Sequence, residues 1–540
     1  MVSIINLIKK PSVWISIVCI ILYFYLSYPY NFIALSTAPI PPVIHYIISA
    51  FRRKGLITVV DENLVFLITH MYSVSTGKPP NERLFTLKGI SGSRYGEYGA
   101  ILQRIALLAR EWGFGFIKAI RIQAQRVTNH VFRDFLTRFS EALNIGEDIE
   151  RFLKSEYEAT ITEYEANYAR VLEAIKTLLG IYTAAASSAI FIVVNMTLIA
   201  LLLYGGLQLV IAALLGTVAA LASLVWLMYK ALPKEKLVHD LKINLLERRI
   251  YAYTVIVAIV LGAILGIFMF RLLNNPAYFM ISFGMMVLVP GLVGRKIEKK
   301  VKRLDNFFIV FIRSFGLTYA NVRNYTLALS SLLRADFGEL TRPLKRLYAR
   351  LTNGVNKKVS WLYFIGETGS ESIRRSIDIF YDSTEAGGDT AKVGTAISNL
   401  LQRIINLRKQ REQVAKAFEA TMYVLHILIV AITEFITTLV ILFQEVFLKM
   451  GTSIPTQLYN ITPIPLEVLV MMKFIMIFTI TLLNAFAMKI ASGGFSGSVW
   501  VNVSILLLLS GITMILSSKL VDMVTQVFNL GMTEFTLPST

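Results

Sequence analysis

The chain of 540 residues is 55% hydrophobic and only 16% charged, with a mean hydropathy of +0.60. Soluble domains carry about 25% charged residues, so the composition excludes an ordinary globular protein and indicates that lipid surrounds much of the chain. The formal net charge is nevertheless +19 and the pI about 9.7. An excess of Lys and Arg is what the cytoplasmic side of a membrane protein requires. Nucleic acid is not expected as a partner, because the sequence has no zinc-ligand set, RNA-binding aromatic motif or Arg-rich tail.

The N-terminal segment imitates a signal peptide. Lys9 and Lys10 precede an apolar stretch, but no small-residue cleavage site follows, so we expect an uncleaved first transmembrane helix. The single cysteine, Cys19, lies in that stretch and excludes an intramolecular disulfide. We expect it to be a buried, inert thiol.

Apolar stretches of about 20 residues, enough to span a bilayer, recur along the chain. The clear ones are 11–29, 181–204, 207–229, 252–273, 277–294, 421–446, 466–489 and 500–517. A weaker one, 31–51, contains Pro39, Pro41 and Pro42. Membrane helices accept proline where their neighbours satisfy the freed backbone groups.

An internal repeat supports the weaker span. A shift of 242 positions places Tyr95-Gly96-Glu97 on Phe337-Gly338-Glu339, and Gly146-Glu147 on Gly388-Asp389. The same shift places 31–51 on 273–293, which is an evident membrane helix. Because repeats reveal architecture more reliably than local patterns do, we predict nine spans.

The predicted fold class is an all-α polytopic membrane protein with nine transmembrane helices and two cytoplasmic helical bundles in tandem. Each repeat has two membrane helices, a polar domain and two further membrane helices, and one extra helix follows. The predicted domains are helices in 1–51, a first polar domain in 52–180, a hairpin in 181–229, a basic connector in 230–251, a hairpin in 252–294, a second polar domain in 295–420, and three helices with a short external tail in 421–540.

The distribution of charge predicts the orientation. Segment 295–419 carries 23 Lys and Arg against 12 Asp and Glu, and segment 52–180 carries 18 against 15. Long domains follow the positive-inside rule weakly, so the clusters Arg52-Arg53-Lys54 and Arg295-Lys296 beside spans count most. They place both polar domains in the cytoplasm. Nine spans also bring Lys9 and Lys10 inside, whereas eight spans would leave them outside.

Both polar domains have the periodicity of helices. Apolar residues recur at helical spacing, namely Leu102, Ile105, Ala106, Leu108 and Ala109, then Phe135, Leu136, Phe139 and Leu143, and in the second domain Leu400, Leu401, Ile404, Ile405 and Leu407. Gly146, Gly354 and Gly387-Gly388 lie where helices would end. We expect compact antiparallel bundles standing on the membrane.

Particular stretches carry a resemblance to a known family. They are Phe135-Leu-Thr-Arg-Phe-Ser-Glu-Ala-Leu-Asn-Ile-Gly-Glu-Asp-Ile-Glu-Arg-Phe-Leu and Thr76-Gly-Lys-Pro in the first repeat, and Asp305-Asn-Phe-Phe, Phe364-Ile-Gly-Glu-Thr-Gly-Ser and Thr384-Glu-Ala-Gly-Gly in the second. Their order and duplication resemble the archaeal form of the type II secretion system F domain, the membrane platform of archaella and archaeal type IV pili. The second copy departs from the first by having Gly388-Asp389 in place of Gly-Glu.

The resemblance implies a scaffold in the cell membrane, which would pass the motion of a cytoplasmic hexameric secretion ATPase to prepilin-like filament subunits. It also implies a homodimer. The family has no catalytic residues to carry over, and neither a cofactor nor a metal is expected. The sequence does not say which filament system is served.

Two groups of charged residues are candidates for contact with the motor or between the domains. The acidic candidates are Glu147, Asp148, Glu150 and Asp389; the bland alternative is that these carboxylates oppose the dipole at a helix N-terminus. The basic candidates are Arg403, Arg408, Lys409 and Arg411, with Lys416 beyond them; anchoring to anionic lipid headgroups is their bland alternative.

Charges within spans are costly in hydrocarbon and therefore informative. Glu434 lies in 421–446 and Lys473 in 466–489, so a pair between adjacent antiparallel helices is expected, with snorkelling of Lys473 as the alternative. His426 is expected to be an interfacial side chain rather than a ligand.

No enzymatic signature was found. Gly77-Lys78 lacks the glycine spacing of a phosphate-binding loop and is followed by proline, and the five histidines lack metal-ligand spacing. A secondary transporter built from parallel internal repeats is the alternative function. A lipid-modifying membrane enzyme would need clustered acids or histidines at the interface. An assembly platform is the function we expect.

Overall fold

The computed structural model describes residues 61–92, 95–202, 206–233, 235–241, 245–450 and 466–533. Every regular element in these ranges is a helix, apart from a single antiparallel bridge between Val238 and Ser370. Seven of the described helices are long and apolar enough to cross a membrane, and each overlaps a predicted span. The prediction of an all-α polytopic membrane protein is therefore confirmed. The predicted spans 11–29 and 31–51 lie outside the described residues.

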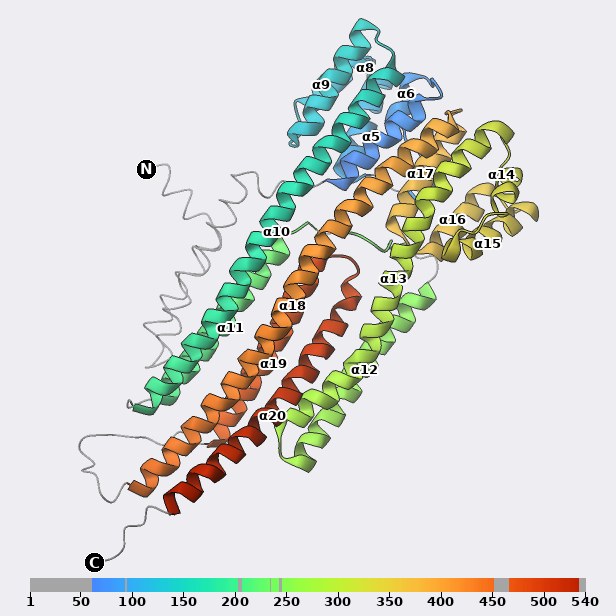
Figure 1. The fold of residues 1–540 in the computed structure, drawn as a ribbon. Helices are drawn as coiled ribbons and strands as arrows, with labels where there is room; N and C mark the ends of the chain where they lie inside the picture. Colours follow the sequence, from blue (N-terminus) through green and yellow to red (C-terminus); the bar gives the residue numbers. More distant parts are fainter. Residues whose placement is uncertain are drawn as a thin grey trace, which may run out of the picture.

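The seven apolar helices form the elongated lower part of the molecule in Figure 1. They are α10 (Ile149–Leu202), α11 (Gly206–Ala231), α12 (Leu245–Leu273), α13 (Pro276–Val322), α18 (Thr390–Met450), α19 (Leu466–Ser492) and α20 (Val499–Thr533).

Three of these helices are much longer than a bilayer is thick. α10 has 54 residues, α13 has 47 and α18 has 61. At 1.5 Å per residue, α18 alone is about 90 Å long, against about 30 Å of hydrocarbon. The predicted domain borders at 180/181, 294/295 and 420/421 fall inside α10, α13 and α18. Each border is thus a change of surroundings along one continuous helix.

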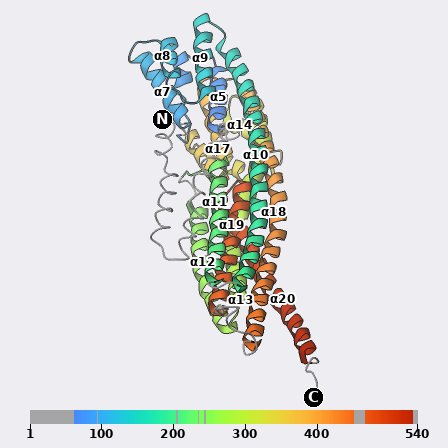
Figure 2. The ribbon, with the colours of Figure 1, turned by 90° about the vertical axis from the view of Figure 1, so that its left-hand side faces the viewer.

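The polar domains are bundles of short helices built on these extensions. The first contains α5 (Glu62–Ser75), α6 (Asn81–Phe85), α7 (Glu97–Arg110), α8 (Phe116–Ala124) and α9 (His130–Ile145). The second contains α14 (Tyr325–Leu332), the 3-10 turn η1 (Gly338–Leu340), α15 (Thr341–Thr352), α16 (Lys357–Thr368) and α17 (Glu371–Glu385). A further 3-10 turn, η2 (Ser496–Ser498), joins α19 to α20. In Figures 1 and 2 both bundles lie at the end of the molecule opposite the C-terminus.

The repeat seen in the sequence reappears in the boundaries of the helices. Asn129 caps α9 and Ser370 caps α17, each by accepting a backbone N–H three residues ahead. The two α-helices are followed by Gly146 and Gly387, with φ of 73° and 77°, a conformation that favours glycine. The predicted helix ends at these glycines are confirmed.

Aromatic side chains fill the core of both bundles. In the first domain Phe135 stacks on Phe139 with ring centroids 5.8 Å apart, and both side chains are buried. In the second, Phe315 packs edge-on against the buried Trp361 at 5.8 Å. Offset and edge-on ring pairs add to the stabilisation that burial of apolar area provides.

Two glycines allow the helices of the second domain to approach closely. Gly316 of α13 faces Gly394 of α18, and a Cβ on Gly394 would lie 2.7 Å from the Ile312 carbonyl oxygen. The hydroxyl of Thr390 donates to the Gly316 carbonyl at 3.1 Å. Backbone contact of this kind fixes α13 on α18 before α18 enters the membrane region.

Candidate functional site

The two polar domains meet along α10 and α18. Lys392 of α18 pairs with Glu150 of α10. Further along the same two helices, Arg403 of α18 pairs with Glu165 of α10 at 2.6 Å. Between these ion pairs the buried hydroxyl of Tyr157 donates to the Ala396 carbonyl at 2.8 Å. The long helices of the two repeats are thus joined by polar contacts before they reach the apolar region.

A second contact joins α17 to the first domain. Asp382 of α17 is buried and lies 2.9 Å from His70 Nε2, and the Arg83 guanidinium donates to its other oxygen. The backbone N–H of Lys88 donates to Asp382 at 2.9 Å. Burial raises the pKa of the Asp382 carboxyl, but the hydrogen bond and charge of His70, with the Lys88 and Arg83 donors, hold it below its usual value.

One turn earlier in α17 the pattern repeats. Asp378 accepts from the backbone N–H of Ser91 at 2.9 Å and from its hydroxyl. Arg374 bridges the domains, since its guanidinium donates to the Ser91 hydroxyl at 2.7 Å and pairs with Glu371. Arg375 places its guanidinium over the Phe66 ring, 5.1 Å from the centroid. Charges from both domains are therefore buried together in this contact, which is the situation in which removal of one partner is costly.

The backbones of the two domains also touch. A Cβ on Gly77 would lie 2.8 Å from the carbonyl carbon of Gly387, and the N–H of Asp389 donates to the Thr76 hydroxyl at 3.0 Å. The segments Thr76-Gly77 and Gly388-Asp389, both singled out in the sequence, thus lie against each other. Glycine at 77 is required by this approach rather than by a bound phosphate.

Where the polar domains meet the membrane helices, charged side chains form a buried group that we call the junction cluster: Glu62, Tyr168, Glu235, Arg408 and Arg411. Arg408 donates to Glu62 at 3.0 Å, and Arg411 donates to Glu235 at 3.1 Å. The Tyr168 hydroxyl donates to the same Glu235 oxygen. Burial raises the pKa of Glu235, but the charges of Arg411 and Arg408 outweigh it and hold the pKa below its usual value.

Arg411 holds three separate segments together. Its side chain is 2% exposed and donates to the carbonyls of Ala491, Ile490 and Pro233 at 3.0, 2.9 and 2.9 Å. α18, the end of α19 and the connector that follows α11 therefore share one guanidinium, which offers five N–H donors in a fixed plane. The structure does not support the alternative role of Arg411, anchoring to lipid headgroups, because the turn after α19 and the connector cover its side chain.

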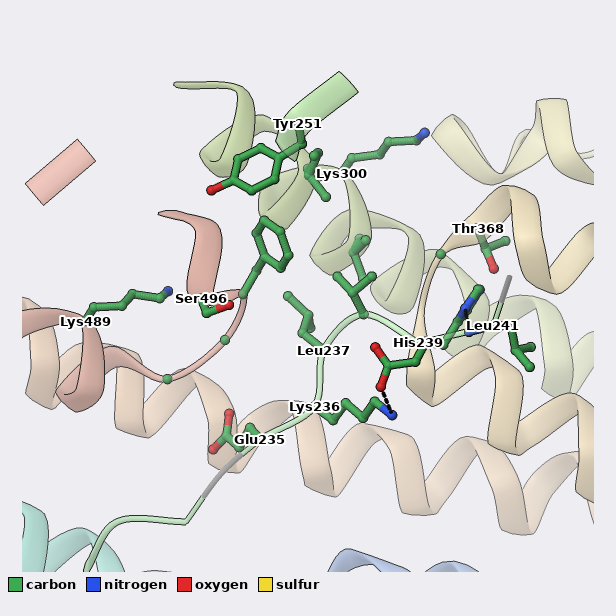
Figure 3. Close-up of a pocket in the computed structure, with 18 of the residues that line it drawn as sticks. Glu235, Lys236, Leu237, His239, Leu241, Tyr251, Lys300, Thr368, Lys489 and Ser496 are labelled. Carbon is green, nitrogen blue, oxygen red and sulfur yellow. Dashed lines mark hydrogen bonds and ion pairs between the residues drawn. The ribbon is translucent and has the colours of Figure 1, made fainter. Parts of the chain in front are cut away.

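A cleft of about 520 Å³ opens beside the junction cluster. Figure 3 shows the connector residues Glu235 to Leu241 along one side, with Tyr251 and Lys300 opposite. Lys236 is paired with Asp240 at 2.7 Å. His239 Nδ1 accepts from the Leu241 N–H at 3.2 Å, so Nε2 carries the proton and donates to the Ile365 carbonyl at 3.0 Å. Burial lowers the pKa of His239, which keeps the ring neutral.

A second ion cluster ties α13 to the end of α19. Glu298 of α13 pairs with Lys302 at 3.1 Å and with Lys489 of α19 at 3.2 Å, and the Ser498 hydroxyl donates to it at 2.6 Å. Lys302 also pairs with Glu412 of α18 at 3.0 Å. The polar ends of three membrane helices are thereby held in register.

Deeper in the apolar region lies a polar group centred on His426. The ring is fully buried, with Ser510 Oγ 2.7 Å from Nε2 and Asn484 Nδ2 3.2 Å from Nδ1. Tyr182 of α10 donates to Asn484 at 2.7 Å. The prediction that His426 is interfacial is wrong, because α10, α19 and α20 surround α18 at this level and exclude lipid headgroups from the ring.

The two intramembrane charges lie together as expected. Lys473 of α19 is 2.8 Å from Glu434 of α18, and their side chains are 11% and 7% exposed. A close pair of this kind avoids the cost of an isolated charge in hydrocarbon.

The acidic candidates divide into helix caps and a domain contact. Asp148 accepts from the Arg151 N–H at 3.0 Å, and this bond holds its pKa below the usual value. Asp389 accepts from the N–H groups of Ala391 and Lys392 at the start of α18. Only Glu150 reaches across to the other domain, whereas the side chain of Glu147 is exposed.

Among the basic candidates, Arg403, Arg408 and Arg411 join the two domains or the connector, and Lys409 is exposed. The sequence reasoning missed Glu62, Glu235, His70, Asp378 and Asp382. Asp378 and Asp382 lie one helical turn apart among the apolar residues of α17, and this spacing was the signal that could have identified them.

Among the residues that the structure describes, no three His, Cys, Asp or Glu side chains gather closely enough to hold a metal ion.

Comparison with known proteins gives two relatives. The chain is 29% identical over 381 residues to "Flagella accessory protein J" of Methanocaldococcus jannaschii, and 26% identical over 377 residues to the protein of the same name from Methanococcus voltae. Each match covers 67% of this chain and 67% of the relative. No protein-family model and no solved structure matches the chain.

Proposed function

We propose that the chain is the membrane platform of an archaellum or a related type IV pilus-like filament, and that it couples a cytoplasmic hexameric secretion ATPase to the extraction and assembly of prepilin-like subunits. The observation that carries the proposal is the similarity to two flagella accessory proteins J over two thirds of each chain. The order of motifs in both repeats supports the same function.

The continuity of α10, α13 and α18 supports a mechanical role. A force applied to the short helices of either polar domain acts on the same rods that continue into the apolar region. Packed helices move as rigid bodies by small rotations and shifts. In the proposed mechanism the motor tilts the polar domains, and the apolar ends of these helices lift a subunit.

The junction cluster supports the transmission of this motion. Because Arg411 binds the connector and the end of α19 as well as Glu235, a movement of α18 is passed to segments that belong to both repeats. The platform itself needs no catalytic residue in this mechanism, since the ATPase supplies the free energy. Both polar domains face the cytoplasm, as the clusters of Lys and Arg beside the spans favour.

The first test interrupts α18 between the second polar domain and the apolar region. Insertion of Gly-Gly-Pro between Glu419 and Ala420 interrupts α18 where it leaves the second polar domain, because proline in a helix interior removes a backbone bond and clashes with the preceding turn. The expected result is a chain that remains in the membrane fraction and a strain without filaments in electron micrographs. The same insertion after Gly354, in the turn between α15 and α16, is the matched control and leaves filaments in place.

The second test is association. The full chain, purified in detergent, is expected to retain the hexameric secretion ATPase of the same organism. Normal filaments in the strain with the broken α18, or no ATPase bound to the intact chain, would overturn the proposal.

A further inference from the structure

One loop of the first polar domain holds a large aromatic side chain out in solvent. Trp112, between α7 and α8, is 67% exposed, and Phe114 and Leu107 beside it are 39% and 46% exposed. Tryptophan is among the residues most buried on average in folded proteins. Exposure of a tryptophan on the surface of a polar domain therefore indicates a contact site for a partner.

Two glycines and a backbone hydrogen bond shape the loop. Gly113 and Gly115 have φ of 67° and 71°, and the N–H of Phe114 donates back to the Leu108 carbonyl at 3.3 Å. The next residue, Phe116, stacks on Phe85 of the domain core with ring centroids 5.3 Å apart. An anchor that is ordered before binding loses little conformational entropy when a partner docks.

Basic side chains surround the aromatic anchor. Residues 104–126 contain five Lys or Arg and one acid, Glu111, and the five cations are exposed: Arg104, Arg110, Lys118, Arg121 and Arg126. Lys118 lies over the Phe114 ring at 5.1 Å, and Arg110 pairs with Glu82 at 2.8 Å. A surplus of cations around an apolar centre is complementary to an acidic protein surface with an apolar pocket.

The second repeat lacks the anchor. The shift of 242 positions places Trp112 on Gly354 and Phe114 on Asn356. Cations are present there too, but Arg346 and Arg350 are both used by Glu367. The two repeats are therefore not equivalent as surfaces, and only the first presents an aromatic anchor on this loop.

The position of the loop suits a soluble partner. α8 lies in the bundle at the end of the molecule opposite the C-terminus in Figures 1 and 2.

We propose that Trp112, with Phe114 and the surrounding cations, is the anchor on which an acidic face of the soluble motor docks. The proposal rests on the platform function and adds to it the surface and the chemistry of contact. One repeat out of two carries the anchor, so a single motor face engages each chain.

The experiment compares binding of the hexameric secretion ATPase of the same organism to the full chain in lipid nanodiscs. Trp112→Ala is expected to weaken binding at least about tenfold, as for a central aromatic anchor. Val310→Ala, an exposed apolar residue of the second domain, is the control and leaves binding unchanged. Reversal of two cations, Arg104→Glu with Arg121→Glu, is expected to slow association and to reduce its dependence on salt.

The outcomes separate this proposal from the function on which it rests. ATPase binding that is equal in wild type, Trp112→Ala and Val310→Ala overturns the anchor and leaves the platform function standing. Absence of binding to the wild-type chain overturns both. A single-stranded DNA oligonucleotide serves as a second probe: if Trp112→Ala weakens its binding and not that of the ATPase, the surface belongs to nucleic acid and the proposal is wrong. Unchanged thermal unfolding of the exposed-site variants shows that the fold is intact.

Discussion

α9 and α17 occupy equivalent places in the two repeats, yet their outward faces differ. Both follow a capping residue, Asn129 or Ser370, and both turn an apolar face to their own bundle. In α9 the opposite face is exposed and carries Glu141. In α17 the residue at the same distance from the cap, Asp382, is buried against the first domain with His70 and Arg83 as partners. One helix is a solvated surface, and its counterpart is the joint between the repeats.

The difference shows what turns a polar helix face into an interface. Burial of a carboxylate is unfavourable unless donors and opposite charges come with it. The first domain supplies them from α5 through His70, and from the segment that follows α6 through Lys88 and Ser91, with Arg83 of α6. The loops between α7 and α8 and between α15 and α16 show the opposite asymmetry, because only the first exposes a tryptophan. The second repeat thus uses α17 for internal joining, whereas the first exposes an aromatic side chain on its loop.

The largest effect is expected at the junction cluster. Arg411→Met removes the charge and keeps most of the volume. It leaves three backbone carbonyls without this donor and takes away the closest cation of Glu235. Breaking a buried pair in this way costs about 3–5 kcal/mol. Thermal unfolding of the detergent-solubilised chain should show a much lower midpoint. Lys409→Met, two residues away and exposed, is the control. Equal midpoints for the two variants would mean that Arg411 is not the tie between the segments.

A matched pair of substitutions tests the difference between α9 and α17 most directly. Asp382→Asn leaves His70 and Arg83 beside a neutral amide, and about 3 kcal/mol of stability is expected to be lost. Glu141→Gln at the corresponding place in α9 is expected to change stability by less than about 0.5 kcal/mol. Urea unfolding of both variants, followed by tryptophan fluorescence, gives the two values. Similar losses would show that the outward faces of α9 and α17 are alike after all.

The membrane helices and the helix ends could be predicted because their signals are local. Apolar length predicted the spans, and glycine predicted the left-handed ends at Gly146 and Gly387. The repeat predicted that the two polar domains share an order of helices. The pair Glu434–Lys473 was also accessible, since two charges in adjacent antiparallel spans have few other partners.

The charged contacts between domains could not be predicted from one sequence. Arg408 meets Glu62 across 346 positions, and Arg411 meets Glu235 across 176. A cation beside a span can reach a lipid headgroup or can be buried beneath a turn of the chain. The local sequence pattern is the same in both cases. His426 was placed wrongly for the same reason, since the exposure of its ring depends on which helices surround α18.

Acid is expected to weaken the α17 joint. The pKa values of Asp382 and Glu371 lie below their usual values in the folded chain, because hydrogen bonds and cations outweigh the effect of burial. Groups with a lowered folded pKa stabilise the fold above their unfolded pKa of about 4, and this stabilisation is lost as the pH falls through the folded pKa. The stabilisation that Asp382 and Glu371 contribute should therefore be constant from pH 7 to 5 and be lost below about pH 4. In Asp382→Asn the fall of the unfolding midpoint should be shallower; an identical slope would exclude Asp382 from the acid response.

The smallest effect is expected at the exposed part of the contact between α10 and α18. Arg403 and Glu165 lie 2.6 Å apart, but their side chains are 47% and 33% exposed, so water and salt screen the pair. A double-mutant cycle with Arg403→Ala and Glu165→Ala should give a coupling free energy below about 1 kcal/mol, and added salt should reduce it further. A coupling as large as that at Asp382 would mean that α10 and α18 hold the repeats together by their surface charges. A small value leaves that role to the buried α17 joint and the junction cluster.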